Sequence, residues 1–290
     1  MNAYLQLLKK HFDKFDTTDI SLISANPNIT LEFAQSNPEY NWSWTNLYAN
    51  KSLTWENIKS RPSHLWDWRF ISKNPNITWE IIQENPDIPW DWYFVSQNPN
   101  ITWEIIQANP DKPWSFDFIS ENPNITWEII QAHPEIDWDW KKISFKSFIT
   151  WEIVQAHPEI DWFWAALSEH PNITWEIIHA NPYAPWLWIC VSTNKNITWA
   201  NVEANPNKDW NWFGLSRNSG ITIRDILNNP DRPWNWVGVS GNTSITIQDV
   251  LSNPDKPWNW VELSYNTNIS CEDMLEYPDK PWLLRSLIFK

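Results

Sequence analysis

The stretch NPNITWEIIQENPDIPWDWYFVSQ, residues 74–97, is followed at residue 98 by NPNITWEIIQ again. The same pattern recurs every 24 residues, and its fourth position is isoleucine, or leucine once, from Ile29 to Ile269. Eleven units therefore fill residues 26–289 without an insertion or a deletion. A fixed period of about 20–50 residues indicates a repeat architecture. We expect one solenoid domain at 26–289, preceded by a capping helix and half-repeat at 1–25, with the last unit (266–290) as C-terminal cap.

Tryptophan is confined to three positions of the unit. All 27 tryptophans stand at the sixth, seventeenth or nineteenth position, which hold seven, eleven and nine of them. The thirteenth position is proline in every unit. Because one tryptophan buries ~150–250 Å², a few such positions can supply the core of a short repeat. We predict that the structural core contains the seventeenth-position set: Trp42, Trp66, Trp90, Trp114, Trp138, Trp162, Trp186, Trp210, Trp234, Trp258 and Trp282.

Each unit is predicted to contain two short helices. In the unit from residue 74, Thr78 can cap a helix that ends near Asn85, before Pro86. We expect Asp87 to cap the second helix, with Pro89 in its first turn. Helices of this length are marginal alone, so neighbouring units must stabilise them. The prediction is an all-α fold, an α-solenoid of eleven 24-residue helix–turn–helix repeats with a right- or left-handed superhelix.

Both ends depart from the repeat, as capping units do. Residues 1–15 are expected to form one amphipathic helix with five side chains on one side: Tyr4, Leu7, Leu8, His11 and Phe12. Residues 16–25 resemble the second half of a unit that has lost its tryptophan pair. In the last unit Leu284 replaces the second tryptophan and Ile288 the usual serine, so this end is expected to pack on the unit before it.

Composition excludes several classes of protein. The net charge is −14 and the pI about 4.8, which disfavours binding to the phosphates of nucleic acids. Cys190 and Cys271 form neither a disulfide framework nor a metal-binding spacing, and suit a reducing compartment. The N-terminus has no apolar signal segment, and the sequence has no apolar run of ~18 residues. We therefore expect a cytoplasmic chain that is neither secreted nor membrane-bound.

Few residues offer chemistry. His133 and His157 occupy the same position in successive units, where most other units have asparagine. A hydrogen-bonding role at the end of the helix is therefore a simpler interpretation than a metal site. First-turn glutamates such as Glu80 suit the helix dipole. The Asn-Ile-Thr sequons are interpreted as helix caps. No nucleotide-binding or nucleophile motif is present. We predict no enzymatic activity, no cofactor and no metal.

The variable positions of the unit are the candidate recognition surface. A stacked array needs constant seams, but its outer surface is free to vary. The eighteenth and twentieth positions and their neighbours change from unit to unit. The candidate partner-binding residues are Arg69, Asp91, Tyr93, Asp117, Asp139, Lys141, Phe163, Asn211, Phe213 and Asn235.

Two functions are the leading hypotheses from these residues, ahead of modular nucleic-acid recognition with one repeat per base. The first is a scaffold or adaptor that binds a protein with a basic or mixed surface along an extended face. The alternative is an array that binds glycans or small ligands through exposed aromatic side chains. If any tryptophans are exposed, we expect the sixth-position set, because that position also accepts Ile223, Ile247 and Cys271.

The gap-free recurrence of NPNITW and PWxW over residues 26–289 resembles the tryptophan-rich repeat proteins of giant viruses of the mimivirus family. The resemblance implies a location in the host cytoplasm or the virion, and it carries no activity or ligand. The last three units depart from the pattern at the sixth position, and have Asp225, Asp249 and Asp273 at the eighth, where isoleucine is usual.

Overall fold

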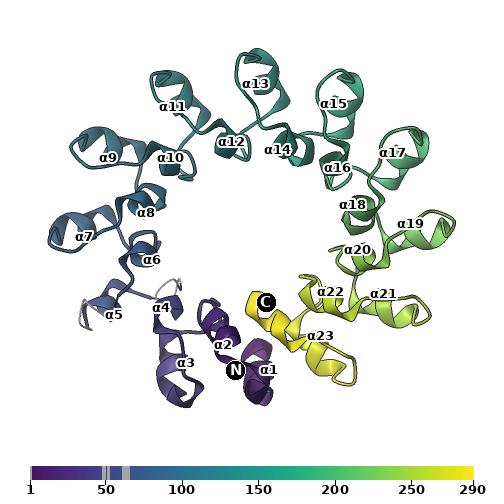
Figure 1. Cartoon of the computed structure of the whole chain (residues 1–290), viewed down its shortest axis with the longest axis horizontal. Coiled ribbons are helices and arrows are strands. Elements are labelled where there is room, and N and C mark those ends of the chain that lie inside the picture. The colour runs from purple at the N-terminus through teal and green to yellow at the C-terminus, as the bar shows by residue number, and fades with distance from the viewer. Residues whose placement is uncertain (1, 48–49, 51–52, 61–65) are drawn as a thin grey trace. The chain divides into compact units, whose positions relative to one another are not determined.

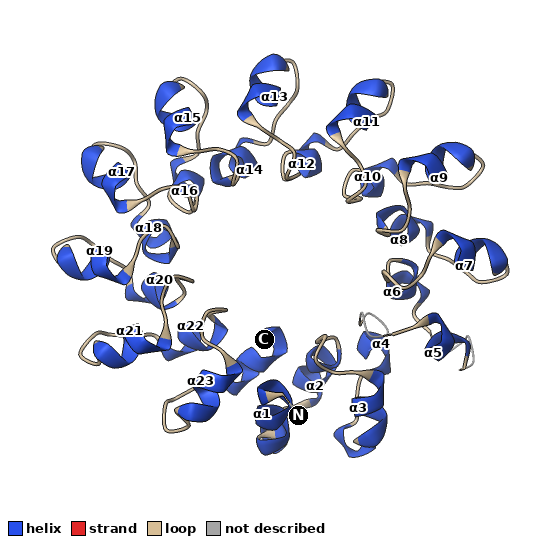
Figure 2. Cartoon of the chain, turned by 180° about the vertical axis from the view of Figure 1, so that it is seen from behind, coloured by secondary structure: helices blue, strands red, loops and turns tan. Residues whose placement is uncertain are grey.

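The computed structural model describes residues 2–47, 50, 53–60 and 66–290. These residues form helices joined by loops, with no strand among them (Figures 1 and 2). The predicted all-α fold of tandem helical repeats, an α-solenoid, is confirmed.

Pro62, the proline of the second unit, and His64 lie outside the described residues. Within the described ranges, none of the helices combines the length and apolarity needed to cross a membrane.

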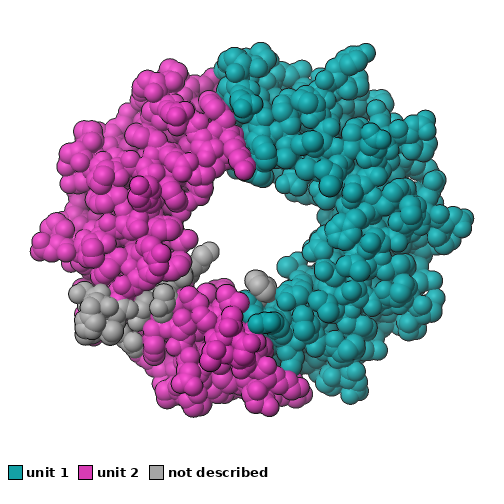
Figure 3. All heavy atoms as spheres, in the orientation of Figure 1, with its two compact units in different colours: residues 1–7, 144–288, 290 teal, residues 8–143, 289 magenta. Residues whose placement is uncertain are grey.

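The chain divides into two compact units (Figure 3). One contains residues 1–7, 144–288 and 290, and the other contains residues 8–143 and 289. The 24-residue sequence period runs through the division at residue 143 without a change.

Odd-numbered helices from α3 onward are the first helices of the repeats. They are α3 (Leu31–Ser36), α5 (Trp55–Lys59), α7 (Trp79–Glu84), α9 (Trp103–Ala108), α11 (Trp127–Ala132), α13 (Trp151–Ala156), α15 (Trp175–Ala180), α17 (Trp199–Ala204), α19 (Ile223–Asn228), α21 (Ile247–Ser252) and α23 (Cys271–Glu276). Each begins at the sixth position of its unit, directly after the capping Thr or Ser.

Even-numbered helices are the second helices. They are α2 (Thr17–Ser24), α4 (Trp44–Leu47), α6 (Trp68–Ser72), α8 (Trp92–Gln97), α10 (Phe116–Ile119), α12 (Trp140–Ile143), α14 (Trp164–Glu169), α16 (Trp188–Val191), α18 (Trp212–Arg217), α20 (Trp236–Ser240) and α22 (Trp260–Tyr265). The N-terminal helix α1 (Ala3–Lys10) and three 3₁₀ segments, at Phe12–Lys14, Pro38–Tyr40 and Leu284–Phe289, complete the described helices.

The predicted first helix is confirmed, but the predicted start of the second helix is wrong. The Thr78 side chain accepts from the Ile81 amide, and α7 ends before Asn85. Helix α8 is capped by Asp91 instead of Asp87. The reason is the Trp90 side chain, whose Nε1 donates to the Asn85 carbonyl oxygen (3.0 Å) and holds the intervening residues as a loop.

The N-terminal helix is also shorter than expected. Helix α1 ends at Lys10, and a 3₁₀ turn follows at Phe12–Lys14. Phe15 is extended, and Asp16 begins a new helix through a capping box with Asp19. This strong cap interrupts the helix expected over residues 1–15. The half-repeat at 16–25 is present as α2.

Buried asparagines at the first position of the unit link successive repeats. The Asn98 side-chain amide donates to the carbonyl oxygens of Ser72 (2.8 Å), Asn74 (3.2 Å) and Ile77 (3.1 Å). Its Oδ1 accepts from the Asn100 amide (2.8 Å). Bonds to the preceding repeat recur at Asn50, Asn74, Asn122, Asn194, Asn218, Asn242 and Asn266. We call this set, with the substitutes described next, the asparagine ladder.

Two other residue types occupy the ladder position. His170 contacts the Lys146 carbonyl oxygen through Nε2 (3.1 Å), and its Nδ1 accepts from the Asn172 amide (3.1 Å). At the end of the chain, the Lys290 ammonium donates to the carbonyl oxygens of Asn266 and Ile269. These acceptors are 24 and 21 residues back, the same offsets that the asparagines use. From His170 onward, the ladder therefore extends to the last residue.

Buried serines at the twenty-third position form a second link. Ser96 donates to the Trp92 carbonyl oxygen (2.7 Å) and accepts from the amide of Ser115 (3.0 Å), where the next second helix begins. Ser24 accepts in the same way from Ser43. One hydroxyl therefore ends one second helix and positions the next.

The tryptophans form clusters of edge and tilted contacts where one repeat meets the next. Trp114 lies between Trp79 (centroids 5.8 Å apart) and Trp92 (5.1 Å) of the preceding repeat. Equivalent pairs surround Trp90, Trp186, Trp210 and Trp234. Of the predicted core set, Trp42, Trp66, Trp90, Trp138, Trp162, Trp186 and Trp210 are buried, and Trp114, Trp234, Trp258 and Trp282 are half-buried.

The sixth-position tryptophans were the set expected to be exposed if any were, and none of the described tryptophans is exposed. Trp79, Trp103, Trp175 and Trp199 of that set are buried. The nineteenth-position tryptophans are all half-buried, because each begins a second helix at the edge of its repeat. No tryptophan is among the exposed large hydrophobic residues of the described chain.

Candidate functional site

Second helices of neighbouring repeats lie side by side in a row within each compact unit, and the first helices form another row (Figures 1 and 2). Contacts join α6, α8 and α10 in residues 8–143, and α18, α20 and α22 in residues 144–288. The twentieth position is the second residue of these helices, and its side chains are exposed from Arg69 to Val261 except for the half-buried Ala165. The row of second helices therefore presents one variable side chain per repeat.

In residues 8–143 the charges on this row are paired with one another. Arg69 forms two hydrogen bonds with Asp67 (3.0 and 2.6 Å). The Lys142 ammonium lies 3.0 Å from Asp117 and 2.9 Å from Glu121. Burial acts to lower the pKa of Lys142, but the hydrogen bonds to Glu121 and Asp117 outweigh it and raise that pKa. These charges are largely satisfied within the chain.

Several eighteenth-position candidates have a local structural role. Asp91 accepts from the amides of Tyr93 and Phe94 (3.1 and 3.4 Å). Asn211 and Asn235 accept from glycine amides three residues later (2.7 and 3.0 Å). Asp139 caps its helix in the same way, through the Lys142 amide (3.1 Å). These side chains position the start of the second helix, so their type reflects capping.

The remaining candidates are placed on the solvent side of the row. Tyr93, Lys141 and Phe213 are exposed, and Phe163 is half-buried against Phe145 (centroids 5.9 Å apart). Tyr93 contacts the edge of Phe118 (5.6 Å).

In residues 144–288 the row carries an apolar stripe, whose residues were not predicted as a group from the sequence. Ile189, Phe213, Val237 and Val261, on α16, α18, α20 and α22, are 61%, 47%, 40% and 48% exposed. Only Phe213 was among the candidate residues. The signal was available in the sequence, since four successive twentieth positions are apolar. We refer to these four residues as the apolar stripe.

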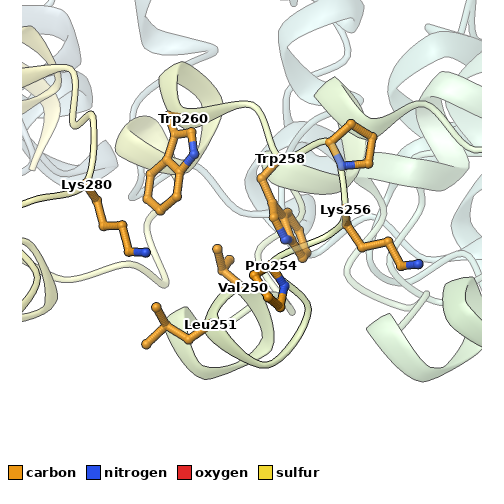
Figure 4. A pocket seen from close by; sticks show the side chains of 8 residues that line it. Val250, Leu251, Pro254, Lys256, Trp258, Trp260 and Lys280 are labelled. Atoms are coloured by element: carbon orange, nitrogen blue, oxygen red, sulfur yellow. The ribbon is translucent and has the colours of Figure 1, made fainter.

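A pocket of about 190 Å³ lies in the repeat of residues 242–265, beside the loop that contains Pro254 and Pro257 (Figure 4). Its walls come from α21, the following loop, α22 and the next repeat, and consist of Val250, Leu251, Pro254, Lys256, Pro257, Trp258, Trp260 and Lys280. The Trp258 indole is held by a hydrogen bond to the Asn253 carbonyl oxygen (2.8 Å). The Lys280 ammonium lies 5.7 Å from the centre of the Trp260 ring.

A smaller cavity of about 60 Å³ occupies the corresponding place in an earlier repeat. It is lined by Trp175, Ile178, His179, Pro182, Ala184, Trp186, Trp188 and Lys208. A separate hollow of about 440 Å³ lies beside Phe116, where phenylalanine replaces the nineteenth-position tryptophan. Its other walls are Asp117, Asp137, Trp138 and Asp139.

The residues considered for other chemistry have structural partners. Trp103 Nε1 donates to His133 Nε2 (3.2 Å), and His133 Nδ1 lies 3.0 Å from Glu135. Asn100, a sequon asparagine, donates to the carbonyl oxygens of Pro75 and Ile77 (2.7 and 2.9 Å). The described part of the chain holds no group of three His, Cys, Asp or Glu residues that could bind a metal.

The two cysteines and the first-turn glutamates are also accounted for. Cys190 and Cys271 are half-buried free thiols, and burial raises the pKa of each. The exposed Glu80 carboxylate has a lowered pKa because the Thr78 hydroxyl donates to it. This places Glu80 in the helix cap.

No protein-family model matches the chain, and neither does any curated protein or solved structure.

Proposed function

We propose that this protein is a non-enzymatic repeat scaffold or adaptor that binds another protein along its row of second helices. The main observation in support is that constant residues lie between the repeats, whereas variable residues lie on the exposed surface. The ladder asparagines, the buried serines at the twenty-third position and most tryptophans face neighbouring repeats, whereas the exposed twentieth position changes chemically from repeat to repeat. Repeat proteins of this kind bind through extended surfaces formed by successive units.

The two compact units differ in the side chains that they present on the row of second helices. In residues 8–143 the Arg69 and Lys142 side chains of the row are paired internally, so they add little free energy on binding. The apolar stripe on residues 144–288 remains in contact with water. Burying such side chains is favourable by about 25 cal/mol per Å². The apolar stripe is therefore proposed as the main contact surface.

The proposed partner has apolar side chains flanked by basic or mixed charge, because the chain carries a net charge of −14. The same charge argues against nucleic acid as the partner. The proposed setting is the cytoplasm of a host cell, or the virion, in keeping with the resemblance to tryptophan-rich repeat proteins of the mimivirus family.

A second candidate function, the binding of a small ligand, is favoured by the tryptophan-lined pocket beside Lys280. A glycan ladder is less well supported, because the tryptophans are buried or half-buried.

Affinity capture with the full chain tests the scaffold proposal. The bait is compared with a variant that carries Ile189→Ser, Phe213→Ser, Val237→Ser and Val261→Ser. The matched control is Tyr183→Ser, which removes a fully exposed aromatic residue from a loop outside the row. We expect captured proteins, read by mass spectrometry, to be lost with the stripe variant and kept with the control. Equal capture by all three baits would reject the stripe as the contact surface, provided that circular dichroism shows equal helicity.

A further inference from the structure

The pocket beside Lys280 is a feature of the repeat, because seven corresponding positions line it in two different units. The ninth, tenth, thirteenth, fifteenth, seventeenth and nineteenth positions contribute in both, together with the fifteenth position of the next unit. The last of these is Lys208 in one pocket and Lys280 in the other. In both cases the lysine lies over the nineteenth-position tryptophan, at 5.3 Å from Trp188 and 5.7 Å from Trp260.

The two pockets differ in volume and in the residue at the sixth position. In the earlier repeat the Trp175 indole lines the cavity, which measures about 60 Å³. In the later repeat Ile247 stands at this position and does not line the cavity, which measures about 190 Å³. Replacement of an indole by a smaller side chain opens space that the rest of a packed repeat fills only in part. The departure of the late repeats from the tryptophan pattern thus coincides with a larger pocket.

Two lysines line the pocket, Lys256 and Lys280, and they occupy the fifteenth position of successive units. Only one of them is paired with a carboxylate. Lys256 is paired with Asp255 (3.0 Å), and in Figure 4 its side chain points away from the hollow. The Lys280 ammonium points toward the hollow between Trp260 and Leu251. Within the described residues no carboxylate lies within salt-bridge distance of it. The pocket therefore offers one cation without an anionic partner.

The other residues that line the pocket determine which kind of uncharged group the ligand can carry. They are aliphatic, proline and indole surfaces, and the Trp258 N–H already donates to the Asn253 carbonyl oxygen. No lining side chain can accept a hydrogen bond from a hydroxyl group. Desolvating sugar hydroxyls here would be unfavourable, whereas an apolar ring would be accepted. A cavity of about 150 Å³ suffices for benzene, so about 190 Å³ suits one ring with a short substituent.

We propose that this pocket binds a carboxylate carried on a single apolar ring, with the ring between Trp258, Trp260 and Val250 and the carboxylate paired with Lys280. The ligand is either a free small acid or the C-terminal residue of a peptide, since both present this chemistry. The site is independent of protein docking on the apolar stripe, so its failure would leave the scaffold function standing.

Binding of 4-fluorophenylacetate to the full chain, followed by ¹⁹F NMR, tests the proposal. Lys280→Gln is expected to weaken binding roughly tenfold or more, because it removes a charge-assisted hydrogen bond. Lys195→Gln, at an exposed lysine of the same compact unit that lines neither pocket, is the matched control and is expected to leave the affinity unchanged. The neutral 4-fluorophenylacetamide is expected to bind weakly and to be insensitive to Lys280→Gln. Equal effects of the two lysine changes, or no binding of the acid at millimolar concentration, would overturn the proposal.

The sixth position provides a test that does not involve charge. Ile247→Trp is expected to fill the pocket and abolish binding, with a thermal unfolding midpoint at least as high as that of the wild-type chain. Trp175→Ile is expected to open the earlier pocket and add a second site that depends on Lys208. Binding that persists in folded Ile247→Trp would refute the assignment.

A peptide series distinguishes the two sources of the ligand. Tighter binding of a short peptide that ends in phenylalanine, compared with its C-terminal amide and with the free acid, would indicate a peptide terminus. Tighter binding of the free acid would indicate a small metabolite-like carboxylate. Either order supports the pocket chemistry, and binding of the peptide amide as tight as that of the peptide acid would contradict it.

Discussion

The side-chain amide of Asn98 donates to the main-chain carbonyl oxygen of Asn74, one repeat earlier, at 3.2 Å. Because ladder bonds at the same offset join successive repeats, the repeat length is part of the hydrogen-bonding pattern. An insertion or deletion within a unit would move the donor away from its acceptors and leave buried carbonyl groups without partners. This accounts for eleven units without a change of length.

Removing a ladder asparagine should destabilise the chain strongly. Asn98→Ala leaves the carbonyl oxygens of Ser72 and Ile77 without this donor and the Asn100 amide without its acceptor. We expect a loss of about 2–4 kcal/mol, since each unsatisfied buried group costs about 1–3 kcal/mol. Urea unfolding followed by circular dichroism measures the effect. The exposed Asn207→Ala is the control, and equal midpoints for both variants would contradict a structural role of the ladder.

The indole N–H and the indole ring of a core tryptophan should contribute separately. Trp186 Nε1 donates to the Asn181 carbonyl oxygen (2.9 Å), and its ring contacts Trp164 (5.3 Å). Trp186→Phe removes the donor and should cost about 1 kcal/mol. Trp186→Ala also removes the ring and should cost about 3–5 kcal/mol. Denaturant titration of both variants would refute this ordering if the two losses were equal.

His170 should make stability depend on pH. Burial lowers its pKa, against a smaller opposing effect of the hydrogen bond to Lys146. An unfolded histidine titrates near pH ~6.5. Below that value the unfolded chain binds a proton that the folded chain resists, because Nδ1 accepts from the Asn172 amide. Stability is therefore full above about pH 6.5 and is lost as the pH falls toward the lowered pKa of the folded state.

His170→Asn restores the residue that most other repeats use and should remove this pH dependence. Thermal unfolding midpoints measured at neutral and at mildly acidic pH give the comparison. His179→Asn, at an exposed histidine, should keep the wild-type dependence. If His170→Asn and wild type lose the same stability on acidification, another group is responsible.

Gly238 should be sensitive to the smallest side chain. A Cβ atom there would lie 2.9 Å from Ser216 Cβ and 3.0 Å from the Phe213 carbonyl oxygen, which belong to the neighbouring second helix. Alanine is favoured over glycine in helices by about 1 kcal/mol, but overpacking costs about 1–3 kcal/mol. We expect Gly238→Ala to lower the unfolding midpoint, whereas Val237→Ala, on the exposed side of the same helix, should change it little. A higher midpoint for Gly238→Ala would show that α18 and α20 can separate without cost.

Much of the local structure was predictable because it depends on neighbouring residues. The Thr78 cap, the end of α7 before Pro86 and the restriction of tryptophan to three positions all follow from short motifs. The start of α8 at Trp92 was not predicted, because it depends on the Trp90 side chain bonding back to Asn85. Propensity alone favoured the earlier Asp87 and Pro89.

The candidate site was predictable only in part. Tyr93 and Phe213 are exposed on second helices, as expected for a recognition surface. Asp91, Asn211 and Asn235 proved to be helix caps, which the sequence alone does not distinguish from recognition residues at variable positions. The pocket depends on Lys280, which comes from the next repeat and lies over Trp260.

By itself, the sequence determined the helical class, the period of 24 residues and the positions that hold tryptophan, because these depend on periodicity and local capping. The tertiary structure alone decided which tryptophans are buried and which are half-buried, which charges are paired and where the repeats leave a cavity. Those properties depend on contacts between residues 19 to 26 positions apart, such as Ser96 with Ser115 and Asn98 with Ser72. Such contacts form only when the repeats stack, so they leave no local signal in the sequence.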